Sequence, residues 1–280
     1  MSEFPDEDLQ KITVGSAGEA ALRESFLLFD IVKWFIKDSE IELNDNSKLL
    51  DFGVGFGRIY RMFLKDFKDG NVIGTDVSQD YIDTCQKCIP FGHFLKNNIS
   101  PPFDLKSESI DVITSYSVFS HLSEKLFTDW QNEFYRVLKP GGIAVFTVRS
   151  FNFILSCNDF KDKEYDQSDA LENYFKHLGS LFSDLDSEYE KFNRGEFLYP
   201  PVDVLTSTEE NLDDLHDGYY NSISYSESVV PPRYLLRQLN KFDILAYINT
   251  PKMPQAVVVL RKPAATNSDR VKFQKNNFVL

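Results

Sequence analysis

Cysteine is scarce in this chain of 280 residues, and its scarcity argues against a disulfide-stapled extracellular scaffold. Only three cysteines occur, an odd number in a chain long enough to bury a core without cross-links. Cys85 and Cys88 form a C-x-x-C pair with His93 nearby. The pair falls within an expected helix and lacks further ligands, so we interpret it as packing and predict no metal site. This thiol usage favours a reducing, cytoplasmic location.

Long hydrophobic runs and a basic surplus are also missing. No segment approaches the roughly 20 apolar residues of a membrane span, and the acidic N-terminus has neither a basic flank nor an apolar signal core. Asp and Glu number 43 against 30 Lys and Arg, so the basic patch typical of nucleic-acid binding is not expected. We therefore expect neither a membrane protein nor a nucleic-acid-binding one. The oligomeric state stays open.

Predicted strands alternate with predicted helices up to about residue 150, a pattern typical of an α/β fold whose parallel sheet is doubly wound, with helices on both faces. A capping box at Ser16 and Glu19 would begin the first helix. Helices are expected at 16–38, 57–67, 79–88, 123–138 and 232–240, and strands at 48–53, 71–76, 93–96, 110–116, 143–148, 242–248 and 255–262.

The alternation stops at one acidic and aromatic segment, residues 151–230. It contains 18 acidic and 5 basic residues, which is the whole net charge of −13, and 14 aromatic residues. Only short helical stretches are expected there. We therefore predict five parts: an N-terminal helical segment (1–44), a core (45–150), the insert (151–230), the last helix and strands of the core (231–262), and a flexible tail (263–280).

A glycine-rich loop follows the first expected core strand, in LLDFGVGFGR (49–58). Glycines at a strand-to-helix turn let the backbone bend tightly and approach a ligand without a Cβ in the way. Asp76 ends the next strand, 23 residues after Gly53. An acid at that position can accept hydrogen bonds from both hydroxyls of a ribose. The two features together predict a site for an adenosine-containing cofactor.

The spacing of the glycines separates two kinds of cofactor. A dinucleotide loop has its third glycine five positions after the first, but here that position is Arg58. Asp51, at the mouth of the loop, would repel a pyrophosphate and suits a cofactor that carries an ammonium group. A nicotinamide dinucleotide is therefore disfavoured.

The pattern D-x-G-x-G-x-G followed by an acid at the end of the second strand resembles the class I S-adenosylmethionine-dependent methyltransferases. The resemblance continues, in the family's order, through NNISPPF (97–103), IDVITSYSVFSHL (110–122) and RVLKPGG (136–142). It implies a mostly parallel, seven-stranded sheet with an antiparallel last strand. It also implies S-adenosylmethionine as cofactor and a small-molecule methyl acceptor.

The resemblance also implies roles for individual residues. Asp51 and the backbone of Phe52 and Gly53 would face the methionine part of the cofactor, together with Gly55, Gly57 and Ser115. Asp76 would hold the ribose and Val77 would lie against the adenine. Either Asn97 or Asn98 would lie at the adenine edge, and the spacing does not choose between them.

Five further residues and one segment are expected at the methyl acceptor. His121 lies beside the place where the transferred methyl sits in the family, so it is a candidate general base for a hydroxyl acceptor. A histidine that caps the next helix or bonds to a backbone carbonyl is the alternative. Residues 151–230 are expected to close over the site as a cap, with an acidic solubilising loop as the alternative. Tyr116, Ser117, Tyr219 and Tyr220 are candidate acceptor-binding residues.

We therefore predict a methyltransferase that acts on a hydroxyl oxygen of a sugar or another neutral metabolite. Two rival functions remain at this stage. One is a nicotinamide-dependent oxidoreductase, against which the glycine spacing and Asp51 argue. The other is a non-catalytic relative that binds the cofactor or a protein as a scaffold; the intact cofactor motif does not bear on turnover.

Overall fold

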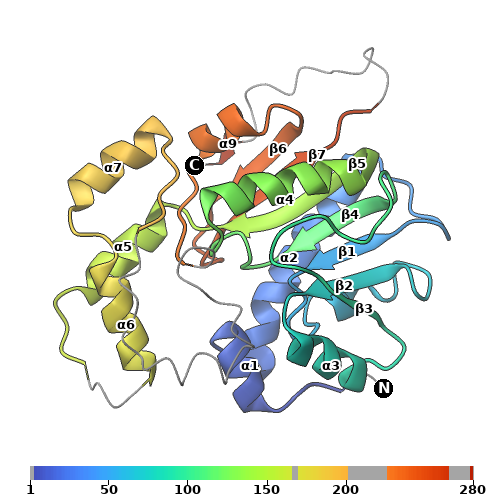
Figure 1. Ribbon diagram of the computed structural model, residues 1–280, viewed down its shortest axis with the longest axis horizontal. Helices are drawn as coiled ribbons and strands as arrows, with labels where there is room; N and C mark the ends of the chain where they lie inside the picture. Colours follow the sequence, from blue (N-terminus) through green and yellow to red (C-terminus); the bar gives the residue numbers. More distant parts are fainter. Residues whose placement is uncertain (1–2, 166–169, 201–225, 265–277, 280) are drawn as a thin grey trace.

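The computed structural model describes residues 3–165, 170–200, 226–264 and 278–279. These residues form a sheet in the order β3-β2-β1-β4-β5-β7-β6-β8 (Figure 1), in which β7 runs antiparallel to both of its neighbours. The predicted doubly wound, mostly parallel sheet with an antiparallel last core strand is thus confirmed. The strands are β1 Leu49–Phe52, β2 Val72–Asp76, β3 His93–Lys96, β4 Ile110–Ser115, β5 Leu138–Val148, β6 Asp243–Ile248, β7 Ala256–Arg261 and β8 Phe278–Val279.

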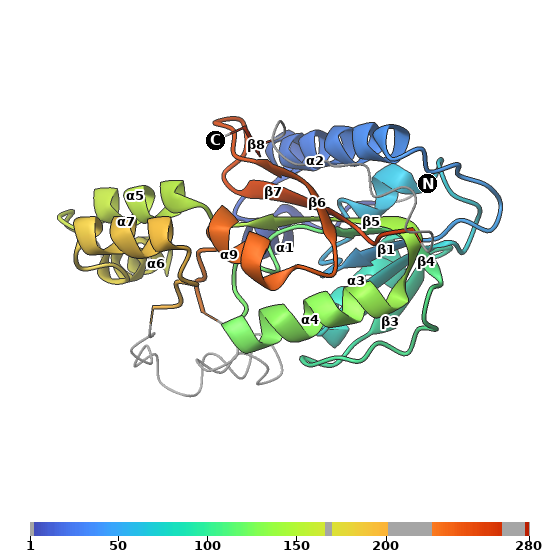
Figure 2. The same ribbon diagram turned by 90° about the horizontal axis from the view of Figure 1, so that it is seen from above.

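Helices cover both faces of the sheet, as Figure 2 shows for α2 and α4 on opposite sides. On one face α2 (Gly18–Asp38) and α3 (Gln79–Cys88) bury Leu28, Val32 and Ile82 against the strands. On the other face α4 (Glu124–Val137) and α9 (Pro232–Gln238) bury an aromatic cluster that includes Trp130 and Phe134. The four-residue spacing of apolar side chains along α4 explains why that face is continuous.

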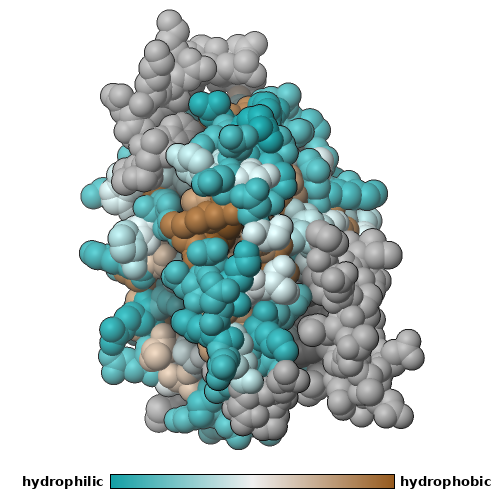
Figure 3. Space-filling model, turned by 90° about the vertical axis from the view of Figure 1, so that its left-hand side faces the viewer, coloured by the Kyte–Doolittle hydropathy of each residue, from teal (hydrophilic) through white to brown (hydrophobic). Residues whose placement is uncertain are grey.

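The described part of the insert forms three helices with their own core. They are α5 (Phe151–Phe160), α6 (Ala170–Ser180) and α7 (Leu185–Arg194). Ile154, Cys157, Leu178 and Phe182 are among the residues buried between them. These helices stand beside the sheet rather than on it (Figures 1 and 2). Figure 3 views the molecule from their side and shows a mostly hydrophilic surface, which agrees with the acidic composition.

The returning end of the insert joins the helices to the sheet. Val229 forms an antiparallel bridge to Leu198 and a parallel bridge to Arg149, the residue after β5. Ser226 and Ser228 donate backbone hydrogen bonds to the carbonyls of His121 (2.9 Å) and Ser120 (2.8 Å). The insert therefore returns alongside the loop that follows β4, at the carboxyl edge of the sheet.

The segment after the glycine loop is not the helix predicted over 57–67. The chain instead makes turns around a short 3-10 helix, η1 (Tyr60–Phe63). Winding at three residues per turn brings side chains i and i+3 to the same side, and both Tyr60 and Phe63 are buried in the core. The short 3-10 helix thus buries both rings in the core.

Four further elements differ from the sequence-based expectation. A helix, α1 (Glu7–Val14), precedes α2; its cap is Asp6, whose side chain accepts from the Leu9 amide at 2.8 Å. The predicted capping box is wrong, because α2 follows Ala17 at its N-cap without a side-chain hydrogen bond. β5 begins at Leu138 rather than 143, and β8, in the expected tail, pairs in parallel with β6.

Candidate cofactor and acceptor site

The glycine loop lies between the ends of β1 and β2 and is held by both. Gly53, Gly55 and Gly57 adopt φ angles of 75°, 50° and 80°, a region that side-chain-bearing residues rarely occupy. The Gly53 amide donates to the Thr75 carbonyl at 2.8 Å. A Cβ on Gly53 would lie only 2.2 Å from a methyl carbon of Val118, so the loop after β4 packs directly on the glycine loop.

Asp76, at the end of β2, is tied to the glycine loop. Its Oδ2 accepts from the Gly55 amide at 2.9 Å and its Oδ1 accepts from the Ser78 amide at 3.0 Å. The side chain is buried, and burial raises the pKa of its carboxyl group, against the effect of these backbone hydrogen bonds. A carboxylate oxygen can accept more than one hydrogen bond, so each retains capacity for a ribose hydroxyl.

Asp51 is the most deeply buried acid of the site. The Thr114 hydroxyl donates to its Oδ1 at 3.0 Å, whereas its Oδ2 accepts no hydrogen bond of normal geometry from the described residues. Burial raises the pKa of Asp51 to about 7, while Thr114, the Tyr60 backbone and the Arg58 charge oppose the rise. A buried carboxylate oxygen without a donor is costly, and an ammonium group would satisfy it.

The structure separates the two candidate asparagines. Asn97 is buried next to the end of β2, since its amide donates to the Asp76 carbonyl at 2.9 Å, and its side-chain oxygen has no partner among the described residues. Asn98 is exposed. The geometry therefore favours Asn97 as the adenine contact, beside the partly buried Val77. Ser115 is likewise buried, and its hydroxyl finds no partner in the described chain.

Helix α1 covers the glycine loop, which the sequence analysis did not foresee. A Cβ on Gly55 would lie 3.1 Å from a methyl carbon of Thr13. Arg61 holds the segment before the helix, because its guanidinium donates to the Glu3 carbonyl at 3.0 Å and stacks 3.8 Å from the ring centre of Phe4. The acidic start of the chain offered no signal for this contact, which joins residues far apart in sequence.

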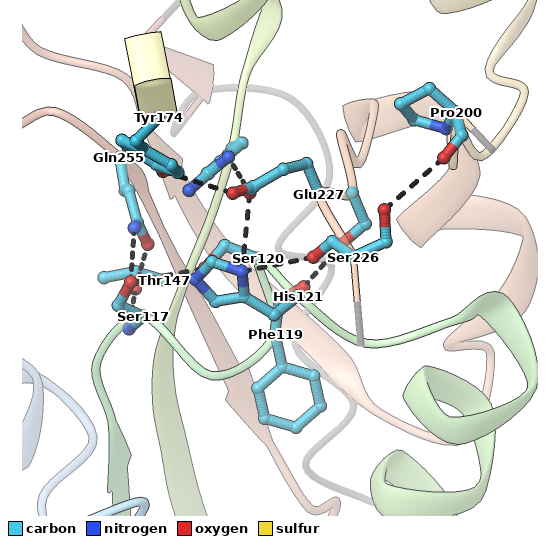
Figure 4. Close-up of polar contacts among 12 residues, drawn as sticks. Ser117, Phe119, Ser120, His121, Thr147, Tyr174, Pro200, Ser226, Glu227 and Gln255 are labelled. Carbon is cyan, nitrogen blue, oxygen red and sulfur yellow. Dashed lines mark hydrogen bonds and ion pairs between the residues drawn. The ribbon is translucent and has the colours of Figure 1, made fainter. Parts of the chain in front are cut away.

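A polar network lines the rim between β4 and β5 (Figure 4). The Ser117 amide donates to the Thr147 hydroxyl oxygen at 2.7 Å, and Thr147 donates to Gln255 at 2.6 Å. Gln255 in turn donates to the Ser117 hydroxyl at 2.8 Å. Ser117 adopts a left-handed φ of 61°, which this network stabilises. Ser117 is thus a partly buried hydroxyl held at the predicted acceptor rim.

His121 belongs to a second polar cluster, which joins the core to the insert (Figure 4). Its Nδ1 lies 3.1 Å from the Ser226 carbonyl oxygen and 3.4 Å from Oε2 of Glu227. Glu227 forms an ion pair with Arg149, and the Tyr174 hydroxyl of α6 donates to its Oε1 at 3.2 Å. The His121 side chain is only 14% exposed. Burial, helped by the Arg149 charge, lowers the pKa of His121 to about 3.

A bond to a backbone carbonyl was one alternative to the base role of His121 in the sequence analysis. The ring does lie within hydrogen-bond distance of the Ser226 carbonyl. A neutral imidazole bonded to a carbonyl through Nδ1 donates from that atom and carries its lone pair on Nε2. That tautomer is the one a proton acceptor needs. Both the base role and the carbonyl contact are therefore compatible with the geometry.

Tyr116 points away from its neighbour Ser117, because successive side chains at a strand end alternate between faces. Its hydroxyl donates to Glu24 of α2 at 2.7 Å, and its ring stacks on the Arg58 guanidinium. Burial, together with Glu24, raises the pKa of Tyr116 above its usual value. These contacts assign Tyr116 to the anchor of α2 rather than to the acceptor. Tyr219 and Tyr220 lie outside the described residues.

The C-x-x-C cysteines lie in the packed interior rather than at a metal site. Cys85 and Cys88 are buried as free thiols, and Cys85 donates to the Gly55 carbonyl at 3.0 Å. Within the described ranges no group of three or more metal-ligating side chains comes together. No helix among these residues is both long and apolar enough to cross a membrane.

Sequence reasoning missed three residues of the acceptor side: Arg149, Glu227 and Gln255. Arg149 and Gln255 flank predicted strands at the carboxyl edge of the sheet. Ligands bind at that edge in α/β folds, so their position in the sequence could have marked them as candidate site residues. Glu227 had no such signal, because only the folded insert brings it to His121.

Comparisons with known proteins agree with this geometry. Residues 49–142 match the model of a methyltransferase domain family. An uncharacterised methyltransferase of Oceanobacillus iheyensis is 30% identical over 54% of this chain, and the match spans 65% of that protein's length. The phosphoethanolamine N-methyltransferase of Plasmodium falciparum is 25% identical over 68% of this chain and 77% of its own.

Two solved structures share the fold over most of both chains. An S-adenosylmethionine-dependent methyltransferase from Clostridium acetobutylicum has a TM-score of 0.55 at 11% identity, over 92% of this chain and 97% of its own. A geranyl diphosphate methyltransferase in complex with its cofactor has a TM-score of 0.51 at 11% identity, over 92% and 91%. At such identities the likeness concerns the fold alone.

Proposed function

This chain belongs to the class I S-adenosylmethionine-dependent methyltransferases, and from that premise we propose that it methylates a hydroxyl oxygen of a small, uncharged acceptor. The acceptor would bind where the loop after β4 meets the insert. The observation that carries the proposal is the pairing of two features at one sheet edge. One is the Asp51 carboxylate oxygen that accepts no hydrogen bond of normal geometry from the described residues, and the other is the largely buried His121 imidazole.

The residues present fit the family's cofactor. Asp51, with the Phe52 and Gly53 backbone and Ser115, would hold its methionine part, and Asp76 would accept from the ribose hydroxyls. Asn97 and Val77 would contact the adenine. When bound, S-adenosylmethionine supplies a methyl carbon activated by a sulfonium charge. Asp51 and Asn97 each have a buried side-chain oxygen without a hydrogen-bond partner in the described part of the chain, and this observation supports the fit.

The acceptor needs positioning, exclusion of water and removal of one proton. A hydroxyl oxygen becomes strongly acidic as it gains a methyl group, so even a weakly basic neutral imidazole can take its proton. His121 would accept that proton at Nε2 while Nδ1 keeps its bond to the Ser226 carbonyl. Ser117, fixed by Gln255 and Thr147, would orient the acceptor.

The charges near His121 favour an acceptor without a negative charge. Glu227 and Arg149 compensate each other at the site, and the insert carries the net negative charge of the chain. An incoming polyanion would meet repulsion from the insert. We therefore favour neutral metabolites such as unphosphorylated sugars.

Methylation of an amine is a second candidate, supported by the relative named as a phosphoethanolamine N-methyltransferase. An amine that arrives deprotonated needs no base, so the two candidates differ in their dependence on His121. Activity that survives His121→Ala would favour the amine.

The test has two stages. Calorimetry should show micromolar-range binding of S-adenosylmethionine and S-adenosylhomocysteine, with NADH as the parallel ligand. Heat from NADH alone would support an oxidoreductase and contradict the proposal. A screen of neutral alcohols, sugars and amines, read out as S-adenosylhomocysteine formed, should then identify the acceptor. Cofactor binding without turnover on any of them would favour a scaffold protein.

A further inference from the structure

Arg149 is a buried cation at the acceptor rim. It follows β5, its side chain is only 8% exposed, and its guanidinium stacks 3.8 Å from the ring centre of Phe153 on α5. Its ion-pair partner is Glu227, whose side chain is 7% exposed. A buried charge of this kind is costly unless it is compensated, so the pair forms one electrostatic unit.

His121 lies at the edge of this unit. Glu227 approaches its Nδ1 at 3.4 Å from the returning end of the insert, and Arg149 acts on it from the end of β5. The Ser226 carbonyl also lies against Nδ1, and the Tyr174 hydroxyl bonds to Glu227 rather than to the ring. Burial and the Arg149 charge lower the pKa of His121, and the Glu227 carboxylate beside Nδ1 carries the opposite charge.

We propose that Arg149 is a positioning residue for His121: by compensating the Glu227 carboxylate, it keeps the imidazole neutral and able to accept a proton from the methyl acceptor. The inference rests on the proposed function, in which His121 faces the acceptor.

The physical reason is that Arg149 and a protonated His121 would both be counter-ions of the Glu227 carboxylate. A carboxylate within about 4–6 Å favours the charged form of its neighbour, and a buried carboxylate without Arg149 would find its counter-ion in a protonated His121. An imidazolium has no lone pair for a proton. With Arg149 in place, the carboxylate is already compensated, and both burial and the guanidinium lower the pKa of His121 to about 3.

The contact from α6 extends this control to the insert. Tyr174 is 41% exposed, and its hydroxyl donates to Glu227, which links α6 to the pair. The insert thus contributes both the carboxylate and one of its hydrogen bonds, while the core contributes the cation and the imidazole.

Histidine NMR tests this without knowledge of the acceptor. The chain has four histidines, so long-range 15N–1H spectra of 15N-histidine-labelled protein resolve each ring, with His121→Gln as the assignment variant. In the wild-type protein His121 should remain a neutral, Nδ1-protonated imidazole from pH 8 to pH 5. In Arg149→Gln its titration midpoint should rise by about 1–3 pH units or more.

Arg149→Lys is the matched control, because it keeps the charge and should keep His121 neutral. Tyr174→Phe is a second variant in case Arg149→Gln does not fold. It removes one hydrogen bond from Glu227. It should raise the titration midpoint of His121 by less than Arg149→Gln does. A wild-type midpoint near 6.5, or equal midpoints in Arg149→Gln and Arg149→Lys, would overturn the inference. These spectra need no cofactor, so failure of S-adenosylmethionine to bind would overturn the proposed function separately.

Discussion

The Asp76 carboxylate offers the sharpest test of the cofactor site, because its contacts are known atom by atom. Asp76→Ala removes the acceptors of the Gly55 and Ser78 amides, at 2.9 and 3.0 Å, along with those proposed for the ribose. Hydrogen bonds to a charged group contribute about 1.5–3 kcal/mol. Loss of the ribose contact on this scale weakens cofactor binding by about 10- to 150-fold.

Calorimetry with S-adenosylhomocysteine measures this loss, and a thermal melt shows whether the variant is folded. Asp80→Ala is the matched control, since Asp80 is an exposed acid in the first turn of α3. It should leave the dissociation constant unchanged. A folded Asp76→Ala protein whose affinity stays within about threefold of the wild type, far below the expected loss, would refute the assignment of Asp76 to the ribose.

Three further predictions follow from the site. Burial raises the pKa of Asp51 from 3.8 to about 7. Between these pH values the folded state binds a proton that the unfolded state has lost, so the free energy of unfolding falls as pH rises. Asp51→Asn should therefore raise the melting temperature at pH 8 and abolish the pH dependence of cofactor affinity near pH 7. His121→Ala should lower kcat by about 10²–10⁴ with a hydroxyl acceptor and leave cofactor affinity nearly unchanged. The pKa of His121 is lowered from the reference 6.5 to about 3. Protonation of His121 should therefore not reduce the kcat of the wild-type enzyme between pH 8 and pH 5. Tyr116→Phe should lower the free energy of unfolding by about 1–3 kcal/mol in a denaturant melt, through the lost bond to Glu24, without changing cofactor affinity; a weaker cofactor complex would return Tyr116 to the ligand site.

The cofactor side was predictable because its information is local. Glycines at alternate positions after a buried strand define a turn, and Asp76 follows from the end of the next strand. The helix predicted over 57–67 is wrong. Burial of Tyr60 and Phe63 is satisfied by a 3-10 turn as well as by an α-helix, and periodicity over so short a span does not distinguish the two.

The acceptor side was predictable only in part, because its contacts are long-range. His121 and Ser117 stood out from their place after β4, but the partners of His121 lie more than 100 positions later in the chain. The contacts of Tyr116 with Glu24 and Arg58 were not predicted for a different reason. Spacing alone does not show which face of the sheet a residue enters when the strand end is uncertain by one position.

This division between local and long-range information has a consequence for specificity. Residues that fit the cofactor come from β1 to β4 and are bonded mainly to one another, as the Asp76–Gly55 and Asp51–Thr114 contacts show. Glu227, which approaches His121, and Tyr174, which bonds to Glu227, are both supplied by the insert. Because the insert has its own buried core, its sequence can change without disturbing the packing of the sheet. Exchange of Glu227 or Tyr174 should therefore alter the choice of acceptor while cofactor binding is preserved, whereas changes at Asp51 or Asp76 should weaken the reaction with every acceptor alike.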